Sequence, residues 1–383
     1  MQDSPLHLVF SDKKFTCTHP LVFPLSANAK RGNLLVYNDL APPLYEVERG
    51  LGGEYMNYFF VLLIKFLLIM TLPALSDIHA AHERIRPFIH NTPVMSSQQL
   101  NKIFDCEMYF KCENFQKVGA FKFRGATNAV LSLSGTEKAR GVVTHSSGNH
   151  AAALSLAAGM NGVRAYIVMP ESAPVVKKNA VAGYGAGITF CKPTLQSREE
   201  TTQLIIKRTG AALIHPYDNF NVICGQGTAA LELLTEKNDL EIIVAPVGGG
   251  GLMSGTSTTA KGLNDKIKVI GAEPLNANDA YISFTTGRLT PSVNPLTIAD
   301  GLLTSLSELT FSIIRQNVDQ MLTAREESII ECMRLIWERM KIIVEPSSAT
   351  ALAVIMENPG IFTGRKVGII ISGGNVDFSK LPF

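Results

Sequence analysis

The stretch VAPVGGGGLMSG, residues 244–255, places four consecutive glycines directly between a predicted strand and a predicted helix. Glycines at such a junction let the backbone come close to a ligand and aim successive N–H groups at it. The N-terminus of the following helix adds a favourable potential for an anion. Gly248, Gly249, Gly250 and Gly251 are therefore predicted to hold a phosphate group. The alternative, a flexible linker, does not suit a position between a buried strand and a helix.

This glycine loop lacks the patterns that bind nucleotides. The dinucleotide fingerprint GxGxxG fails, because its last position falls on Met253 when it starts at Gly248 and on Ser254 when it starts at Gly249. The Walker pattern fails as well, since no Gly-Lys pair follows the glycines. The loop is thus expected to bind a single phosphate group carried by a molecule other than a nucleotide.

On both sides of the loop, short strands alternate with helices, which indicates an α/β fold with a parallel sheet and right-handed crossovers. Residues 141–217 form one compact stretch of this kind and are predicted to be a small domain, inserted between the two parts of a larger domain, 70–140 and 218–383. The predicted strands are 141–146, 164–170, 188–193, 212–217, 241–247, 268–274 and 366–375. Residues 248–263 are predicted to be a glycine loop running into a helix, and the other predicted helices are 150–159, 173–185, 197–210, 224–237, 327–341 and 347–357.

Composition narrows the class of protein. The 383 residues are 46% apolar and 18% charged, which is typical of a globular chain long enough for two domains. The net charge is +2, with no basic block that would follow a phosphate backbone, so nucleic acid is not an expected partner. The six cysteines form no CxxC pair and no Cys/His metal spacing, which indicates reduced core thiols and a cytoplasmic protein.

The N-terminal residues stand apart from this pattern. Residues 58–75, YFFVLLIKFLLIMTLPAL, are strongly apolar but are interrupted by Lys65 and Pro73, so their apolar runs are shorter than the roughly 20 residues that span a bilayer. We expect the compact enzyme to begin near Met70, with residues 1–69 as a poorly ordered extension or sequence upstream of it. A tilted membrane anchor at residues 58–75 is the alternative.

The stretch AFKFRGA, residues 120–126, sets Lys122 between two phenylalanines. An amine held in a dry pocket favours the neutral, nucleophilic form over the ammonium ion, as a lysine that forms a Schiff base requires. The alternative is an ordinary lysine at the surface of a helix or strand whose neighbours are core residues. Arg124, two positions further on, is expected to be structural.

Three further stretches carry polar groups at strand ends. Serine and asparagine at the start of the helix in THSSGNHAAA (144–153) suit a carboxylate, or are plain N-caps. The serine of IISGGNVD (370–377) either forms a turn or bonds a neutral ring nitrogen of a ligand. The two acids and one carbonyl of GAEPLNANDA (271–280) could hold a hard divalent cation, or the acids are merely solvated. The candidate residues are Ser146, Ser147, Asn149, Ser372, Glu273, Ala277 and Asp279, whereas His145 and His150 are expected to be structural.

These motifs, in this order, resemble the tryptophan-synthase-β-like family of pyridoxal-phosphate (PLP) enzymes of fold type II. Within it they are most similar to the branch of serine racemase, threonine dehydratase and threo-3-hydroxyaspartate dehydratase. The resemblance runs from about residue 76 to the C-terminus and implies a two-domain parallel-sheet fold. The motifs that carry it are ENFQKVGAFKFRGA, THSSGNH, GQGT, PVGGGG, AEPLNAND, TIADGL, WERMK, EPSSA and SGGNVD.

The resemblance implies a role for each candidate. Lys122 would carry the cofactor, Phe121 would pack against its ring, Asn149 would meet the ring's 3′ oxygen and Ser372 its nitrogen. The four glycines would hold the phosphate. Ser147 would be a second acid–base group on the face opposite Lys122. Ser146, Ser147 and Arg198 would meet the substrate, and Glu273, Ala277 and Asp279 would hold Mg²⁺, Ca²⁺ or Mn²⁺.

The expected activity is β-elimination from L-serine, L-threonine or L-threo-3-hydroxyaspartate, giving a 2-oxo acid and ammonia. Racemisation of serine is the alternative main activity, and β-replacement, as in cysteine synthase, is a further one. The second carboxylate of hydroxyaspartate needs a cation, which Arg198 or Arg124 could supply. From a different class, a membrane-tethered PLP-binding protein without activity is also considered. The family resemblance implies a homodimer.

The sequence departs from the family in two places. Ala120 stands where many members of the family have serine, and HPYDN (215–219) looks more like the dehydratases than like mammalian serine racemase.

Overall fold

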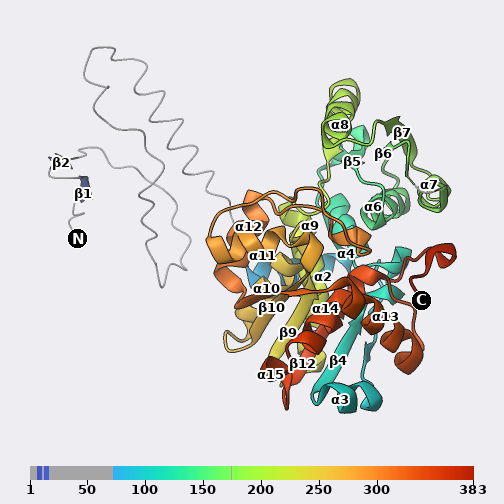
Figure 1. The fold of residues 1–383 in the computed structure, drawn as a ribbon. Helices are drawn as coiled ribbons and strands as arrows, with labels where there is room; N and C mark the ends of the chain where they lie inside the picture. Colours follow the sequence, from blue (N-terminus) through green and yellow to red (C-terminus); the bar gives the residue numbers. More distant parts are fainter. Residues whose placement is uncertain (1–6, 11–12, 17–71, 174) are drawn as a thin grey trace. The chain divides into compact units, whose positions relative to one another are not determined.

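The computed structural model describes residues 7–10, 13–16, 72–173 and 175–383 (Figure 1). Residues Met70–Phe383 form one compact unit, and residues 1–69 are assigned to another. In the N-terminal part, strand β1 (His7–Phe10) pairs antiparallel with β2 (Lys13–Thr16). The predictions of an extension over 1–69 and of an anchor at 58–75 fall almost entirely outside the described residues. Among the described residues, no helix has the length and apolarity needed to cross a membrane.

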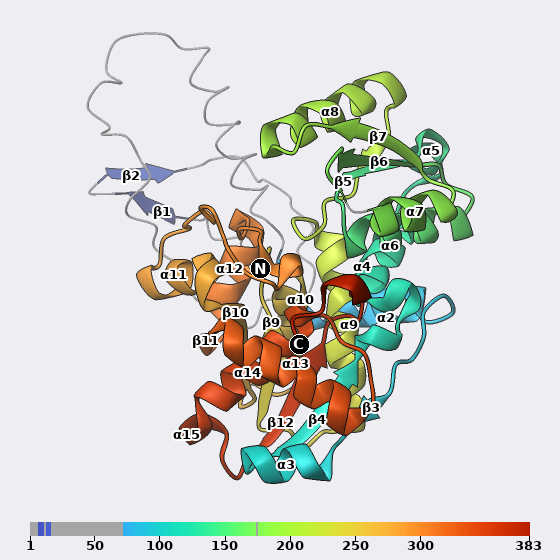
Figure 2. The ribbon, with the colours of Figure 1, turned by 45° about the vertical axis from the view of Figure 1, so that its right-hand side comes forward.

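A six-stranded sheet runs through the compact unit in the order β11-β10-β9-β12-β4-β3 (Figure 2). The neighbouring strands are parallel except for β3, which runs antiparallel to β4 at one edge. The strands are β3 (Val94–Met95), β4 (Glu107–Cys112), β9 (Ile242–Pro246), β10 (Lys268–Pro274), β11 (Gln320–Ala324) and β12 (Lys366–Ile371).

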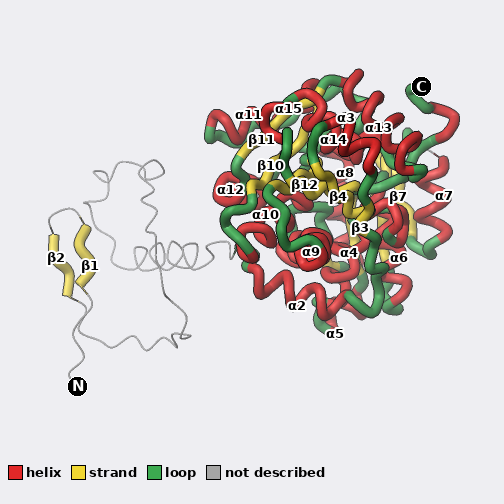
Figure 3. Tube along the Cα trace, turned by 90° about the horizontal axis from the view of Figure 1, so that it is seen from below, coloured by secondary structure: helices red, strands yellow, loops and turns green. Residues whose placement is uncertain are grey.

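Helices cover both faces of this sheet, so the arrangement has three layers (Figure 3). Strand β9 shows why: Ile242 and Val244 belong to the core under α13, α14 and α3, whereas Ile243 and Ala245 belong to the core under α9, α10 and α12. A strand that buries both faces is apolar throughout, as parallel strands generally are. These helices are α3 (Gln98–Phe104), α9 (Phe220–Glu236), α10 (Gly251–Leu263), α12 (Glu308–Asn317), α13 (Glu326–Met340) and α14 (Pro346–Glu357).

A second sheet, wholly parallel, has the order β7-β6-β5-β8 and is formed by residues 142–213, within the predicted small domain. Helix α6 packs on one face, and α8 on the other, where Val143 and Val168 meet Ile205. Whether this part moves as a separate domain stays a prediction. The elements are β5 (Val142–His145), β6 (Ala165–Pro170), β7 (Gly187–Cys191), β8 (Ala212–Leu213), α5 (Gly135–Arg140), α6 (Asn149–Met160), α7 (Val175–Gly183) and α8 (Leu195–Thr209).

The α/β class and the parallel sheets were predicted correctly, but the strand predicted at 212–217 was wrong in extent. It ends at Leu213, because the chain turns away after it, so that the Pro216 carbonyl meets Lys122, and Pro216 has no N–H to offer a neighbouring strand. The remaining helices are α2 (Leu75–Ile85), α4 (Lys122–Leu131), α11 (Asp279–Thr286) and α15 (Pro359–Phe362), with short 3₁₀ turns η2 (Glu113–Phe115), η3 (Lys117–Gly119), η4 (Leu275–Ala277), η5 (Asp300–Leu302) and η6 (Phe378–Lys380).

Candidate active site

Lys122 is the first residue of helix α4, which begins beside the end of strand β12. The backbone N–H of Phe121 donates to the Ser372 carbonyl at 3.0 Å, which fixes the start of α4 against this strand end. The Lys122 amine lies 5.1 Å from the centre of the Phe121 ring and donates to the Pro216 carbonyl at 3.0 Å. Burial lowers the pKa of Lys122 to about 8, against an opposing effect of the negative charge of Glu345.

The glycine loop offers backbone donors without a partner in the described part of the chain. Among the residues that the structure describes, no hydrogen bond involves the backbone N–H groups of Gly248, Gly249, Gly250 or Gly251, although all four residues are buried. Gly250, with φ of 84°, caps helix α10 without a side-chain partner. Buried backbone donors are rarely left unpaired. The loop therefore has the donor set of an anion site at a helix N-terminus.

Tyr217 explains why the loop needs glycine. A β-carbon at Gly249 would lie 2.2 Å from an atom of the Tyr217 ring, and one at Gly251 would lie 2.9 Å from the β-carbon of the same tyrosine. Because Tyr217 directly follows Pro216, whose carbonyl accepts from Lys122, the same short segment contacts both the lysine and the loop. Burial raises the pKa of Tyr217 to about 12, so its hydroxyl stays protonated.

Asn149, at the start of α6, is held by two residues from the C-terminal part of the chain. Its side-chain nitrogen donates to both carboxylate oxygens of Glu345 at 3.1 Å, and its oxygen accepts from the side-chain nitrogen of Asn375 at 2.9 Å. The backbone N–H of Asn375 also donates to Glu345, at 3.2 Å. The three side chains thus form one closed polar cluster.

Ser372, at the end of β12, is buried, and its hydroxyl lies 2.9 Å from the hydroxyl of Ser348. Ser348 also donates to the Gly373 carbonyl at 2.7 Å, so this hydroxyl is fixed by the turn that follows the strand. A serine is uncharged, and the Ser372 hydroxyl can donate to a neutral ring nitrogen, which is an acceptor only.

Burial favours the neutral form of three histidines in this part of the chain. Burial lowers the pKa of His150 to about 3 and that of His215 to about 4, and it also lowers the pKa of His145. His150 is 3.1 Å from the Ile214 carbonyl through its Nε2, as expected for a structural residue. The rings of His145 and His215 lie 5.4 Å apart, edge to face.

The predicted substrate residues are less closely tied to Lys122. Ser146 and Ser147 lie in the turn between β5 and α6, where the Ser146 hydroxyl accepts from the Gly148 N–H at 3.4 Å. Arg198 is on α8, and its Nε is buried without a hydrogen-bond partner among the described residues. The contacts of the structure bring neither Ser147 nor Arg198 against Lys122, so their roles stay predictions.

The two acids of the candidate cation site lie together. Glu273, at the end of β10, accepts the backbone N–H groups of Ala280 at 3.1 Å and Tyr281 at 2.6 Å. Both carboxylate oxygens of Asp279 are buried without a hydrogen-bond partner in the described part of the chain. Burial, and then the charge of Asp279, raises the pKa of Glu273 well above its usual range, and burial raises the pKa of Asp279 to about 6. Ala277 lies between them on η4.

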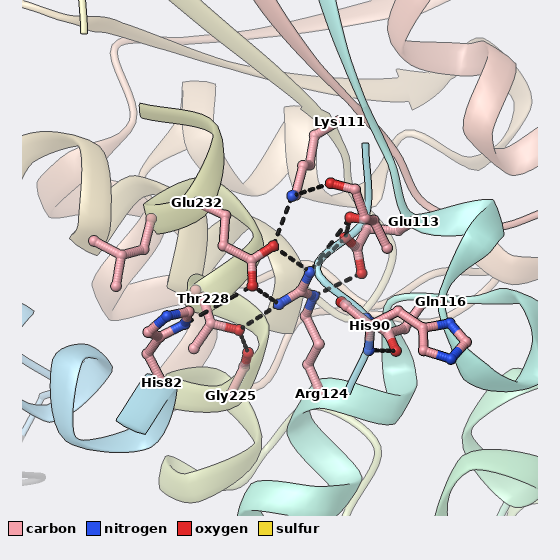
Figure 4. Close-up of polar contacts among 12 residues, drawn as sticks. His82, His90, Lys111, Glu113, Gln116, Arg124, Gly225, Thr228 and Glu232 are labelled. Carbon is pink, nitrogen blue, oxygen red and sulfur yellow. Dashed lines mark hydrogen bonds and ion pairs between the residues drawn. The ribbon is translucent and has the colours of Figure 1, made fainter. Parts of the chain in front are cut away.

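Arg124 is confirmed as structural. It is completely buried between two carboxylates, with Nε 2.7 Å from Glu113 and Nη1 2.7 Å from Glu232 (Figure 4). The amine of Lys111 reaches Glu232 at 2.6 Å from the opposite side. This cluster ties α4 to β4 and α9, close to the lysine of the candidate site.

Sequence reasoning assigned no role to four residues of the site, namely Glu345, Ser348, Asn375 and Tyr217. The motif EPSSA contained a usable signal, since proline at the first position marks a helix start and puts Glu345 at the N-cap of α14. Ser348, three residues later, then lies on the same side of the helix start. The pairing of Glu345 with Asn149, far away in sequence, had no local signal.

Known proteins of similar sequence and fold cover most of the chain. Serine racemase from Dictyostelium discoideum is 53% identical over 319 residues, covering 82% of this chain and 98% of that protein. A beta-hydroxyaspartate dehydratase from Paracoccus denitrificans is 48% identical, covering 82% of this chain and all of that protein. The crystal structure of a threonine deaminase from T.th. superposes with a TM-score of 0.77 at 42% identity, covering 80% of this chain and 100% of that chain.

The family model described as "Pyridoxal-phosphate dependent enzyme" matches residues 85–373, a span that contains every site residue predicted from the sequence. The match extends from α2 to the turn after β12, and so includes both sheets. The chain therefore belongs to the family of pyridoxal-phosphate-dependent enzymes.

Proposed function

We propose that this enzyme is a dehydratase that releases ammonia from L-serine, L-threonine or L-threo-3-hydroxyaspartate and leaves a 2-oxo acid. The observation that carries the proposal is a partly buried Lys122 amine whose pKa is lowered by desolvation. The segment of Pro216 and Tyr217 links it to a loop whose N–H donors have no partner among the described residues. The relatives reported above are named for reactions of serine, threonine or hydroxyaspartate, which supports this choice of substrates.

The residues fit pyridoxal phosphate. The unpaired N–H groups of Gly248 to Gly251 suit its phosphate, and Phe121 offers an apolar surface beside Lys122 for its ring. When bound, the cofactor supplies an electron sink for the carbon that loses a proton. Lys122 would take that proton at Nζ, because burial favours its neutral amine. Ser372, uncharged, would leave the ring nitrogen unprotonated, which favours prompt loss of a β-hydroxyl.

Racemisation of serine is the second activity that we propose for this site. It requires a proton donor on the face opposite Lys122, and Ser147 is the residue that the family resemblance assigns to that role. Ser147 stands in the turn before α6, and α6 packs against α4, the helix that starts with Lys122. The cation for a second substrate carboxylate would be Arg198, because Arg124 is already paired with Glu113 and Glu232.

The test is a comparison of 2-oxo acid release from the three substrates, with the full chain, PLP and Mg²⁺ in each assay. We expect release from at least one substrate, and the ranking identifies the natural substrate class. D-serine formation is measured in parallel by chiral chromatography. If none of the three substrates released a 2-oxo acid, the dehydratase proposal would be contradicted. The alternatives would then be racemisation, β-replacement or a PLP-binding protein without activity.

We further propose that Glu273, Asp279 and the carbonyl of Ala277 hold Mg²⁺ or a similar hard cation, with water completing the shell. Support comes from the two unpartnered oxygens of Asp279 among the described residues and from the raised pKa values of both acids. Two buried like charges destabilise the folded chain, and a cation between them removes that cost.

We also propose that the enzyme is a homodimer, as the family resemblance implies.

The cation site predicts that Mg²⁺ raises the melting temperature, and more so at pH 8 than at pH 6. Both acids must lose their protons to bind the metal, and the pKa of Asp279, about 6, falls within that range. At a hundredfold excess over the dissociation constant, the stabilisation is about 2.7 kcal/mol. Asp279→Asn should abolish the effect. Asp239→Asn, which changes an exposed acid paired with Lys366, serves as the control. An equal Mg²⁺ effect in both variants would contradict the site.

A further inference from the structure

Glu345 is a buried carboxylate to which the reaction described above assigns no task. Its exposed fraction is 4%, and among the described residues none of the ion pairs includes it. An uncompensated buried charge is costly, and a glutamine would fill the same space at a lower desolvation cost. A carboxylate kept in such a place points to a function rather than to packing.

The position of Glu345 ties it to the strand end that carries Ser372. It is the N-cap residue of α14, and its backbone N–H donates to the Gly373 carbonyl at 3.0 Å. On the first turn of the same helix, Ser348 holds the Ser372 hydroxyl at 2.9 Å. The first turn of α14 therefore fixes two polar side chains that are expected at different atoms of the cofactor ring, Ser372 directly and Asn149 through Glu345.

The hydrogen bonds of Asn149 define which way its amide points. An ionised carboxylate is an acceptor only, so Glu345 requires the NH₂ group of Asn149 on its side, while Asn375 donates to the Asn149 oxygen. An amide nitrogen carries two hydrogens, so one remains for a further acceptor such as the ring oxygen. A protonated Glu345 can donate as well as accept, and it no longer enforces this orientation.

We propose that Glu345 is a positioning residue that, as a carboxylate, holds the Asn149 amide with its N–H directed at the 3′ oxygen of the cofactor ring. The inference rests on the proposed function, because it assumes that PLP is bound at Lys122. It assigns to the first turn of α14 the task of keeping the ring's polar contacts in place while protons move at the Lys122 amine.

The charges around Glu345 make its ionisation sensitive near neutral pH. Burial raises the pKa of Glu345 to about 7, the bonds from Asn149 and Asn375 lower it, the charge of Asp300 on η5 raises it, and Lys177 on α7 lowers it. In turn, the charge of Glu345 raises the pKa of Lys122 on α4. The orientation of Asn149 should therefore be enforced at pH 8 and released at pH 6.

The test compares the absorbance spectrum of the bound cofactor between pH 6 and pH 8 in the wild type, Glu345→Gln, Asn149→Ala and the double variant. Glutamine can donate, so it reproduces the protonated acid. We expect Glu345→Gln to bind PLP within about tenfold of the wild-type affinity and to show at pH 8 the spectrum that the wild type shows at pH 6. Its kcat should fall about 10- to 100-fold with KM changed less than about threefold. The double variant should be no worse than Asn149→Ala alone.

Glu357→Gln is the matched control, because Glu357 is the last residue of α14 and pairs with the exposed Arg325. It should leave the spectrum and kcat unchanged. An unchanged pH response of the spectrum in Glu345→Gln would overturn the inference, as would independent, multiplicative effects of the two single variants. A wild-type chain that binds no PLP would overturn the proposed function together with it, so the two failures are distinguishable.

Discussion

Lys122→Ala should lose at least about 10³-fold in 2-oxo acid release while the protein stays folded. The lysine supplies both the bond to the cofactor and the base for the substrate proton, and removing a general base alone costs about 10²- to 10⁴-fold. Among the described residues the Lys122 amine makes one hydrogen bond, to the Pro216 carbonyl, so its removal costs little stability. The measurement is steady-state release of 2-oxo acid, together with the circular dichroism spectrum and melting temperature of the variant.

Lys117→Ala is the matched control. Its amine lies 5.7 Å from the centre of the Phe123 ring, much as the amine of Lys122 lies 5.1 Å from that of Phe121. Equal losses in the two variants would contradict a specific role for Lys122.

The lowered pKa of Lys122, about 8, adds a pH test, since the neutral amine is the form that attacks the cofactor aldehyde. The rate at which the apo-enzyme takes up PLP should therefore rise with pH through about 8 and level off above it.

Arg124→Met should lower the free energy of unfolding of the apo-enzyme by about 3–5 kcal/mol, because it leaves buried carboxylates without their main cation. Glu113 and the Arg124 side chain are both fully buried, and Lys111 is left to balance Glu113 and Glu232 alone. The loss of one cation from such a cluster costs more than the loss of an exposed ion pair. Urea unfolding of both proteins at about pH 7.5, with the slopes compared, measures the difference.

Arg334→Met is the control, since Arg334 and Glu338 form an exposed pair at 2.9 Å on the surface of α13. Its cost should stay below about 1 kcal/mol. A cost of this size for Arg124→Met as well would mean that the buried cluster does not hold α4 against β4 and α9. The stability of the helix start that carries Lys122 would then have to come from the apolar contacts of Phe123 in the neighbouring core.

The alternation of strands and helices from residue 141 onward was readable because each strand is a short apolar run that ends at glycine, proline or a polar residue. Strand β4 gave no such signal. Its sequence EMYFKC carries Lys111 within a buried stretch, and the charge is balanced by Glu232, which lies far along the chain. Local patterns record that a residue is charged, but they do not record the distant partner that allows it to be buried.

Only part of the candidate site could likewise be predicted from the sequence. The glycine loop carries its own signal, since four glycines between a strand and a helix are unusual wherever they occur. The stretch around Lys122 left an ordinary surface lysine open, and the family resemblance made it the expected cofactor lysine. The supporting residues carry none. Glu345 meets Asn149 and Tyr217 meets Gly249 only because the two sheets bring distant segments together, and such contacts come from the fold. The Arg198 and Ser147 assignments rest on family resemblance and stay predictions.

The most direct test of the central claim is to find which lysine carries the cofactor. The full chain is incubated with PLP, reduced with sodium borohydride, digested and examined by mass spectrometry for a lysine bearing the reduced pyridoxyl phosphate. We predict one modified peptide, containing Lys122 next to Phe121 and Phe123, and no modified peptide from the Lys122→Ala variant treated in the same way. A modification at another lysine, or none in the wild type, would contradict the claim that Lys122 binds the cofactor.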